Sequence, residues 1–129
     1  MIVDTSAIMA LLLKEPEASA FGAALAEQPR SAISAATLVE LCIVAEGRAG
    51  MAVWAEVEAL LAGVEVEVVP FTAGQAALAR EGWRRFGKGR HPAGLNLGDC
   101  FAYALARERG EPLLFKGEDF ARTDVRRAL

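Results

Sequence analysis

The first thirteen residues place a short buried strand directly before a helix, with a single acid between them. Ile2 and Val3 are apolar and β-branched, as in the strands of a parallel sheet that is covered on both faces. Thr5 and Ser6 are good helix N-cap residues, and an apolar run follows them. Ligands of open α/β sheets bind just beyond the carboxyl ends of the strands, which is where Asp4 falls. Asp4 is therefore either a helix cap or a ligand for a cation.

Segments typical of strands alternate with segments typical of helices along the rest of the chain. Residues 64–69 alternate between apolar and acidic side chains up to Val68, which predicts a strand near a sheet edge. Strands alternating with helices imply an α/β fold with a mostly parallel sheet covered on both faces. The 129 residues show no linker or internal repeat, so we expect one domain over residues 1–129. The other expected helices are 17–27, 35–47, 51–61, 72–86 and 97–109, and the other strands are 31–34, 112–115 and a last short one at Val125.

Composition and charge exclude several classes of protein. A net charge of −3 excludes a strongly basic, non-specific nucleic-acid binder, but it leaves room for a local basic patch. No apolar run approaches the length of a membrane span, and no basic segment precedes the first strand, so we expect neither a membrane segment nor a signal peptide. The two cysteines, Cys42 and Cys100, fit reduced thiols in a core. We therefore expect a cytoplasmic protein.

Two acids lie on helices that have few other charges. Glu40 is the only charged residue between positions 31 and 45, where a surface glutamate would normally have charged neighbours one turn away. Asp99 follows Asn96 by three residues, which suits a helix cap. The residues after Asp99 are apolar, and a buried carboxylate is costly unless it is paired or coordinated. Pattern alone favours a functional role for Glu40 and leaves Asp99 open between a cap and a ligand.

A fourth acid follows the strand at 112–115. Asp119 lies just beyond this strand, across a tight Lys-Gly turn, and Glu118 is its rival for the same position. The pattern is nearly as compatible with a solvated acid in a turn as with an acid of a functional site. If Asp119 joins Asp4, Glu40 and Asp99, the carboxylates repel one another by about 4 kcal/mol per pair at ~4 Å and an effective dielectric of ~20.

Such a cluster must take up protons or bind a cation. All-oxygen ligands select hard ions, which predicts Mg²⁺ or Mn²⁺ as the cofactor. His91 is the only histidine, so a histidine-based metal site is excluded. Hard ions held by carboxylates suit the hydrolysis of phosphodiester bonds, because they activate water and stabilise charge on the phosphate.

Four motifs together resemble one family over essentially the whole chain. They are IVDTSA at residues 2–7, SAATLVE at 34–40, LNLGDCFAYA at 95–104 and LLFKGEDF at 113–120. In order and spacing they resemble the PIN-domain ribonucleases, and within them the VapC-type toxins of bacterial toxin–antitoxin pairs. The resemblance implies a three-layer α/β/α sandwich around a five-stranded parallel sheet. It also implies a metal-dependent endoribonuclease that acts on structured RNA such as tRNA or rRNA, forms a homodimer and is inhibited by a VapB-like antitoxin.

The resemblance also implies roles for particular residues. Asp4 and Asp99 match the family's most regular metal ligands, and Glu40 matches its helical acid. Many relatives place the fourth acid one or two residues earlier than Asp119, where this chain has Gly117 and Glu118; we take Asp119 and keep Glu118 as the alternative. Around these ligands, we expect supporting hydrogen bonds from Thr5 or Ser6 to a ligand carboxylate, and from Asn96 to orient Asp99.

RNA contact is expected along the stretch from Arg80 to His91. Basic side chains alternate there with Trp83 and Phe86, which fits either a basic rim beside an acidic centre or a solvated helix face with Trp83 in the core. The expected contacts are Arg80, Arg84, Arg85, Lys88 and Arg90, with Lys116 as a further one.

Two other functions compete with the nuclease. A signalling receiver domain also begins with a strand that ends in an aspartate, but it needs a second aspartate near mid-chain, and none occurs between Asp4 and Asp99. A catalytically silent PIN-like module that only binds a partner would have no need for the acids or for a metal.

Overall fold

Four short strands form the centre of the molecule in the computed structural model, which describes residues 1–129. They are β1 (Ile2–Val3), β2 (Ser31–Ser34), β3 (Val66–Val69) and β4 (Leu113–Leu114). All of them run parallel, in the order β3-β2-β1-β4. The predicted parallel sheet is confirmed, and β3 lies at an edge as the alternating pattern of residues 64–69 indicates.

The sheet has four strands, so the expected fifth strand at Val125 is wrong. The backbone N–H of Val125 donates to the Thr123 hydroxyl in a local turn and is not free for a ladder. Only a single parallel bridge follows, between Leu113 and Arg127. Because β4 is only two residues long, it offers the last segment too little edge for a longer pairing.

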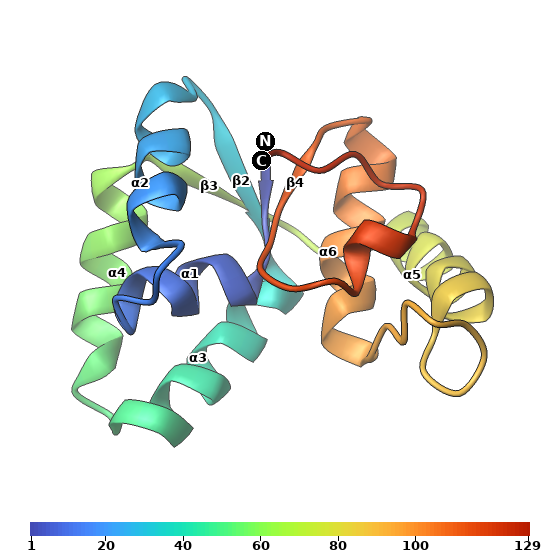
Figure 1. The fold of residues 1–129 in the computed structure, drawn as a ribbon, viewed down its shortest axis with the longest axis horizontal. Helices are drawn as coiled ribbons and strands as arrows, with labels where there is room; N and C mark the ends of the chain where they lie inside the picture. Colours follow the sequence, from blue (N-terminus) through green and yellow to red (C-terminus); the bar gives the residue numbers. More distant parts are fainter.

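Six helices cover the sheet, and Figure 1 shows them divided between its two sides. The helices α1 to α4 lie on one side, and α5 and α6 lie on the other. None of these helices is both long and apolar enough to cross a membrane. The helices are α1 (Thr5–Leu12), α2 (Ala18–Glu27), α3 (Ala35–Ala49), α4 (Val53–Gly63), α5 (Ala73–Phe86) and α6 (Leu97–Arg109), followed by a 3₁₀ turn at Phe120–Arg122.

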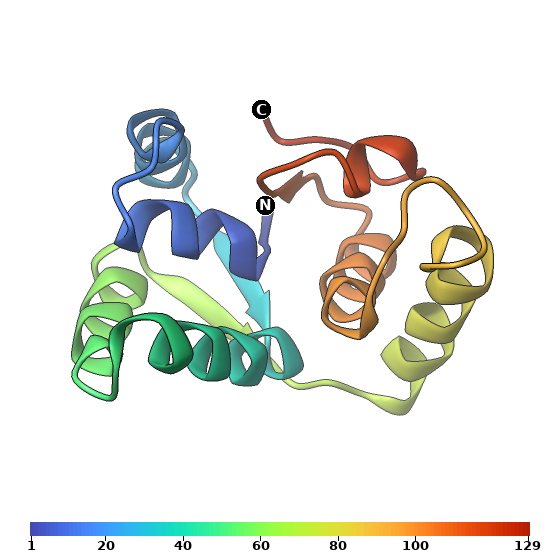
Figure 2. The ribbon, with the colours of Figure 1, turned by 60° about the horizontal axis from the view of Figure 1, so that its bottom comes forward.

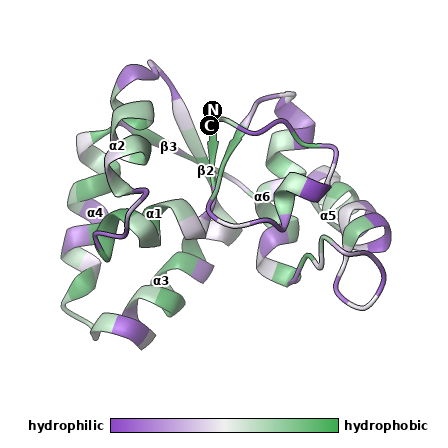
Figure 3. Ribbon diagram, viewed as in Figure 1, coloured by the Kyte–Doolittle hydropathy of each residue, from purple (hydrophilic) through white to green (hydrophobic).

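Alternate strand residues point to opposite faces and so build two cores. Ile2 and Leu113 join the core under α5 and α6, whereas their neighbours Val3 and Leu114 join the core under α1 to α4. The four side chains are almost completely buried. In Figure 3 the central strands β1 and β4 are correspondingly hydrophobic, while the loop after α5 is hydrophilic.

Most helix boundaries follow the capping signals in the sequence. The Thr72 hydroxyl accepts from the Gln75 N–H at the start of α5, and Asn96 caps α6. At α1 the cap is Asp4, which is one of the two roles that the sequence leaves open for this residue. Asp4 itself accepts from the Ser6 N–H, so Thr5 and Ser6 lie inside the helix. β3 also starts two residues later than expected, because Glu65 has a positive φ of 50° and ends the preceding turn.

The carboxyl ends of β1 and β2 lead directly into helices. Asp4 separates β1 from α1, and Ser34 ends β2 and caps α3. The start of α6 is packed beside them, as the turned view in Figure 2 shows. The first turns of several helices therefore meet at the carboxyl ends of the strands, where the predicted acids lie.

Candidate active site

Asp4 is held at the end of β1 by the first turn of α1. The residue is 3% exposed. The N–H of Ser6 donates to Asp4 Oδ2 at 2.9 Å, and the Ser6 hydroxyl donates to the same oxygen. The other oxygen, Oδ1, is buried and has no hydrogen-bond partner. Asp4 is therefore a helix cap through one oxygen and an unsatisfied acceptor through the other.

Glu40 and Asp99 are held in the same one-sided way. The Thr5 hydroxyl donates to Glu40 Oε2 at 2.8 Å. The N–H of Asn96 donates to Asp99 Oδ2 at 2.8 Å, and the Asp99 N–H donates back to Asn96 Oδ1 at 2.9 Å, which completes a capping box. No hydrogen bond engages Glu40 Oε1 or Asp99 Oδ1. Each of these two carboxylates thus keeps one oxygen fixed and the other available, like Asp4.

The three acids line one cavity of about 320 Å³. It lies where β1 ends and the first turns of α1 and α6 meet the middle of α3. Burial raises the pKa of Asp4 to about 6, against the lowering effect of the Ser6 hydrogen bonds and with a further increase from the charge of Glu40. Burial also raises the pKa of Asp99 to about 7, with further increases from the charges of Asp4, Asp119 and Glu40. The acids thus repel one another within a partly desolvated space.

The fourth acidic position is less enclosed. Asp119 is exposed, at the start of the 3₁₀ turn, and makes no side-chain cap there. Its charge nevertheless contributes to the raised pKa of Asp99, and Glu118 is not among the main causes of that increase. This proximity favours Asp119 over Glu118 as the fourth acid, although neither lines the cavity.

The chemistry of the donor set fits a hard divalent cation. The free oxygens all belong to carboxylates, and a cation would satisfy the buried Asp4 Oδ1, which has no hydrogen-bond partner in the protein. No three Asp, Glu, His or Cys side chains are gathered tightly enough to form a ready-made metal site. Asp4, Glu40 and Asp99 are the residues that fit, with Asp119 beside them.

Comparison with known proteins places this geometry in a family. The family model of the PIN domain matches residues 1–126. A protein named Ribonuclease VapC from Mycolicibacterium smegmatis is 49% identical over 125 residues, which cover 97% of each chain. Ribonuclease VapC30 from Mycobacterium tuberculosis is 46% identical over 125 residues, covering 97% of this chain and 95% of its own. The chain belongs to the PIN-domain family. The high identity places it among the VapC ribonucleases of that family, as its four motifs predict.

Two solved structures share the fold. VapC20 of Mycobacterium tuberculosis, described as a sarcin–ricin loop cleaving toxin, superposes with a TM-score of 0.78 at 20% identity, over 96% of this chain and 95% of that one. A toxin–antitoxin complex from Klebsiella pneumoniae gives 0.70 at 19% identity, over 99% and 97%. The predicted α/β class is therefore confirmed. The VapC relatives favour the nuclease over both the receiver domain and the silent module.

Further charged residues line the acidic cavity of this PIN domain. Arg48 and Glu15 are two that the sequence analysis missed. Arg48 lies eight residues after Glu40 on α3, and this spacing returns to the same helix face, so the helical period was an available signal. Glu15 has no such signal, because it lies in a loop. It pairs with Lys116, another cavity residue, at 2.7 Å.

Only some of the basic side chains predicted to contact RNA lack a partner within the protein. Arg85 pairs with Asp124 at 2.8 Å, and the Arg90 guanidinium lies 4.1 Å from the centre of the Trp83 ring. Lys116 is engaged by Glu15 and by Glu17. By contrast, Arg80, Arg84 and Lys88 are exposed and form no ion pair.

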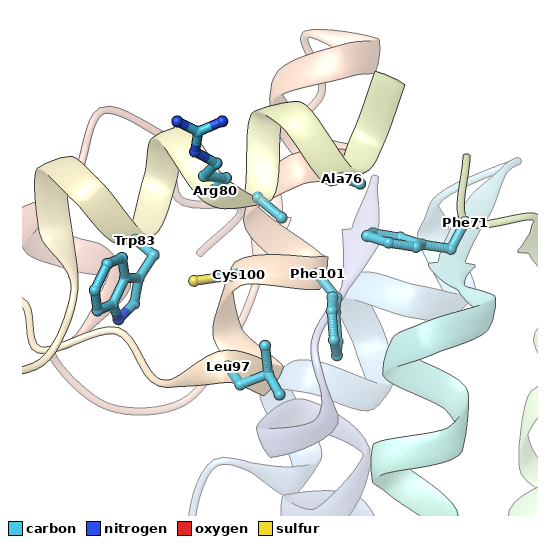
Figure 4. Close-up of a pocket in the computed structure, with 8 residues that line it drawn as sticks. Phe71, Ala76, Arg80, Trp83, Leu97, Cys100 and Phe101 are labelled. Carbon is cyan, nitrogen blue, oxygen red and sulfur yellow. The ribbon is translucent and has the colours of Figure 1, made fainter. Parts of the chain in front are cut away.

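Trp83 is not a core residue, since it is 40% exposed. It forms one wall of an apolar cavity of about 370 Å³ between α5 and α6, drawn in Figure 4, with Phe71 and Phe101 on the opposite side. Arg80 is the only charged residue lining it. Because the cavity contains no acid, it is separate from the candidate active site.

The raised carboxyl pKa values predict how stability depends on pH in the absence of metal. The folded chain binds protons at Asp4 and Asp99 below pH values of about 6 and 7, whereas the unfolded chain binds them only below about 3.8. The stability contributed by these groups is therefore present at acidic pH and is lost as the pH rises from 4 to 8. In EDTA, we expect Asp99→Asn to raise the free energy of unfolding at pH 8 by ~1 kcal/mol. This value is discounted because Asp99 is partly exposed to solvent. The variant should also show a weaker dependence of stability on pH.

Urea unfolding at pH 5 and pH 8 measures this effect, and Asp124→Asn is the matched control. Asp124 pairs with Arg85 and Arg107 and accepts from the Tyr103 hydroxyl, so its replacement should lower the unfolding free energy. A lower stability of Asp99→Asn at pH 8 would show that the acidic site is not electrostatically strained.

Proposed function

We propose that this chain is a metal-dependent endoribonuclease toxin that hydrolyses phosphodiester bonds in structured RNA, such as tRNA or rRNA, in the cytoplasm. A cognate VapB-like antitoxin would neutralise it. The observation that carries the proposal is the set of three carboxylates at the carboxyl ends of the strands. In each of them one oxygen accepts a hydrogen bond from the protein and the other has no hydrogen-bond partner. The names of the VapC relatives at 46–49% identity support the same reaction.

Asp4, Glu40, Asp99 and Asp119 would hold Mg²⁺ or Mn²⁺. A bound divalent ion supplies an activated water and stabilises negative charge on the scissile phosphate. The protein's own part is to present the acids. The Ser6 donors leave Asp4 Oδ1 as the available oxygen, and Thr5 does the same for Glu40. Asn96 fixes the orientation of Asp99 through the capping box.

The exposed cations that form no ion pair suit the RNA backbone. We propose that Arg80, Arg84 and Lys88 contact phosphates, together with Arg48 at the rim of the acidic cavity. Arg85, Arg90 and Lys116 would have to exchange their present partners for phosphates.

We further propose a homodimer, as the VapC resemblance implies. Val39 and Ile43 on α3 are 59% and 68% exposed, and this apolar surface suits a protein partner. Sedimentation velocity tests the proposal, because a monomer at micromolar concentration would contradict it.

Cleavage of total cellular RNA by the purified, antitoxin-free protein tests the proposed reaction. We expect discrete fragments with Mg²⁺ or Mn²⁺ and none with EDTA. Asp4→Asn should lower kcat about 10³-fold, because it removes an oxygen ligand worth several kcal/mol while an amide can still accept from Ser6. Circular dichroism should show an unchanged fold. Cleavage that persists in EDTA or in the variant would show that the activity comes from a contaminant. The function of the protein itself would then be partner binding alone.

The fourth acid is decided by comparing neighbouring substitutions. Asp119→Ala should weaken Mn²⁺ binding and lower kcat at least about tenfold, because its charge acts on Asp99. Glu118→Ala is the matched control, because Glu118 is the neighbouring residue and is also exposed. Its Mn²⁺ affinity and kcat should stay within about twofold of the wild-type values. The reverse order of effects would transfer the role to Glu118.

The contribution of the free arginines appears in the salt dependence of RNA binding. The double variant Arg80→Ala/Arg84→Ala should raise KM and reduce the slope of log K against log salt by about 1 to 2, because each phosphate contact releases counterions. Arg107→Ala is a control, since Arg107 is already paired with Asp124. KM measured between 50 and 200 mM salt gives the slope. An unchanged slope in the double variant would place the RNA elsewhere.

A further inference from the structure

The backbone conformation of α6 does not require a glycine at position 98. Gly98 lies in the first turn of α6, and its φ is not positive, so any residue could adopt its conformation. Glycine weakens a helix relative to alanine, because it loses more conformational freedom on folding. Two other helical glycines, Gly47 in α3 and Gly63 in α4, have open space where a side chain would be. Gly98 is instead buried.

The Glu40 carboxylate fills the space that a side chain on Gly98 would occupy. A Cβ atom added to Gly98 would come within 2.5 Å of Glu40 Oε1, Cδ and Oε2 alike. No real Cβ tolerates such contacts, so Glu40 would have to move. Thr5 holds Glu40 from the other side through its 2.8 Å hydrogen bond to Oε2. The carboxylate is thus confined between the first turn of α1 and the first turn of α6.

We propose that Gly98 is a positioning residue that acts through Glu40. Its missing side chain lets the Glu40 carboxylate lie against α6 next to Asp99, so that both acids face one cation. The inference rests on the proposed metal-dependent function. A methyl group at position 98 would push Glu40 away from Asp99 without removing any acid.

A double-mutant cycle between positions 98 and 40 tests this role by Mn²⁺ binding, measured by isothermal titration calorimetry. We expect Gly98→Ala to weaken Mn²⁺ binding at least tenfold. In a Glu40→Ala background the same substitution should change the affinity by less than twofold, because no carboxylate remains to be displaced. Gly47→Ala, on α3 with open space around it, is the control and should bind as the wild type does.

Thermal unfolding in EDTA provides a second readout that does not involve the metal. Gly98→Ala should lower Tm when Glu40 is present, since the two side chains overlap. It should raise Tm when residue 40 is alanine, since alanine favours the helix and the space is then free. A role for Gly98 in helix structure alone predicts the same sign in both backgrounds.

The outcomes separate this inference from the function on which it rests. Wild-type Mn²⁺ affinity in Gly98→Ala, or a loss that persists in the Glu40→Ala background, overturns the positioning role and leaves the metal site intact. A wild-type chain that binds no Mn²⁺ overturns the metal-dependent function, and the positioning role with it.

Discussion

The repulsion among the carboxylates at the end of β1 is the constraint on which the rest of the structure depends. Asp4 and Asp99 have pKa values of about 6 and 7 because they are partly desolvated and share their space with other acids. Such an arrangement opposes folding, so the stability must come from elsewhere. It comes from two apolar cores, one on each face of the sheet, whose strand residues are almost completely buried. The short strands act as a rigid support for charges that would otherwise separate.

The donors that hold the acids come from few residues. Thr5 and Ser6 are neighbours in the first turn of α1, but successive helical residues point about 100° apart, so Thr5 reaches Glu40 on α3 while Ser6 reaches Asp4. The Ser6 hydroxyl also accepts from the Lys116 N–H at 3.0 Å, which ties the segment after β4 to the same site. Segments more than a hundred residues apart in the chain therefore meet through one hydroxyl group.

Much of this site could be predicted from the sequence, because local patterns place the residues. Asp4 follows an apolar strand, Asn96 and Asp99 have capping-box spacing, and Glu40 is the only charge in a long apolar segment. Features that depend on packing between distant segments could not be predicted from the sequence. The pairing of Lys116 with Glu15 is one of these. So is the loss of the fifth strand, where a local turn at Thr123 takes the Val125 N–H from the sheet.

The same electrostatic strain bears on the proposed binding of a cation near neutral pH. Carboxyls with pKa values of about 6 and 7 are partly protonated there, so a divalent ion would compete with protons and release them on binding. Each oxygen already fixed by Ser6, Thr5 or Asn96 reduces the ordering that binding requires. The protein thus meets the cost of assembling the acids during folding, when its cores form. A cation that entered afterwards would relieve the repulsion and satisfy the buried Asp4 Oδ1, so its binding would also raise the stability.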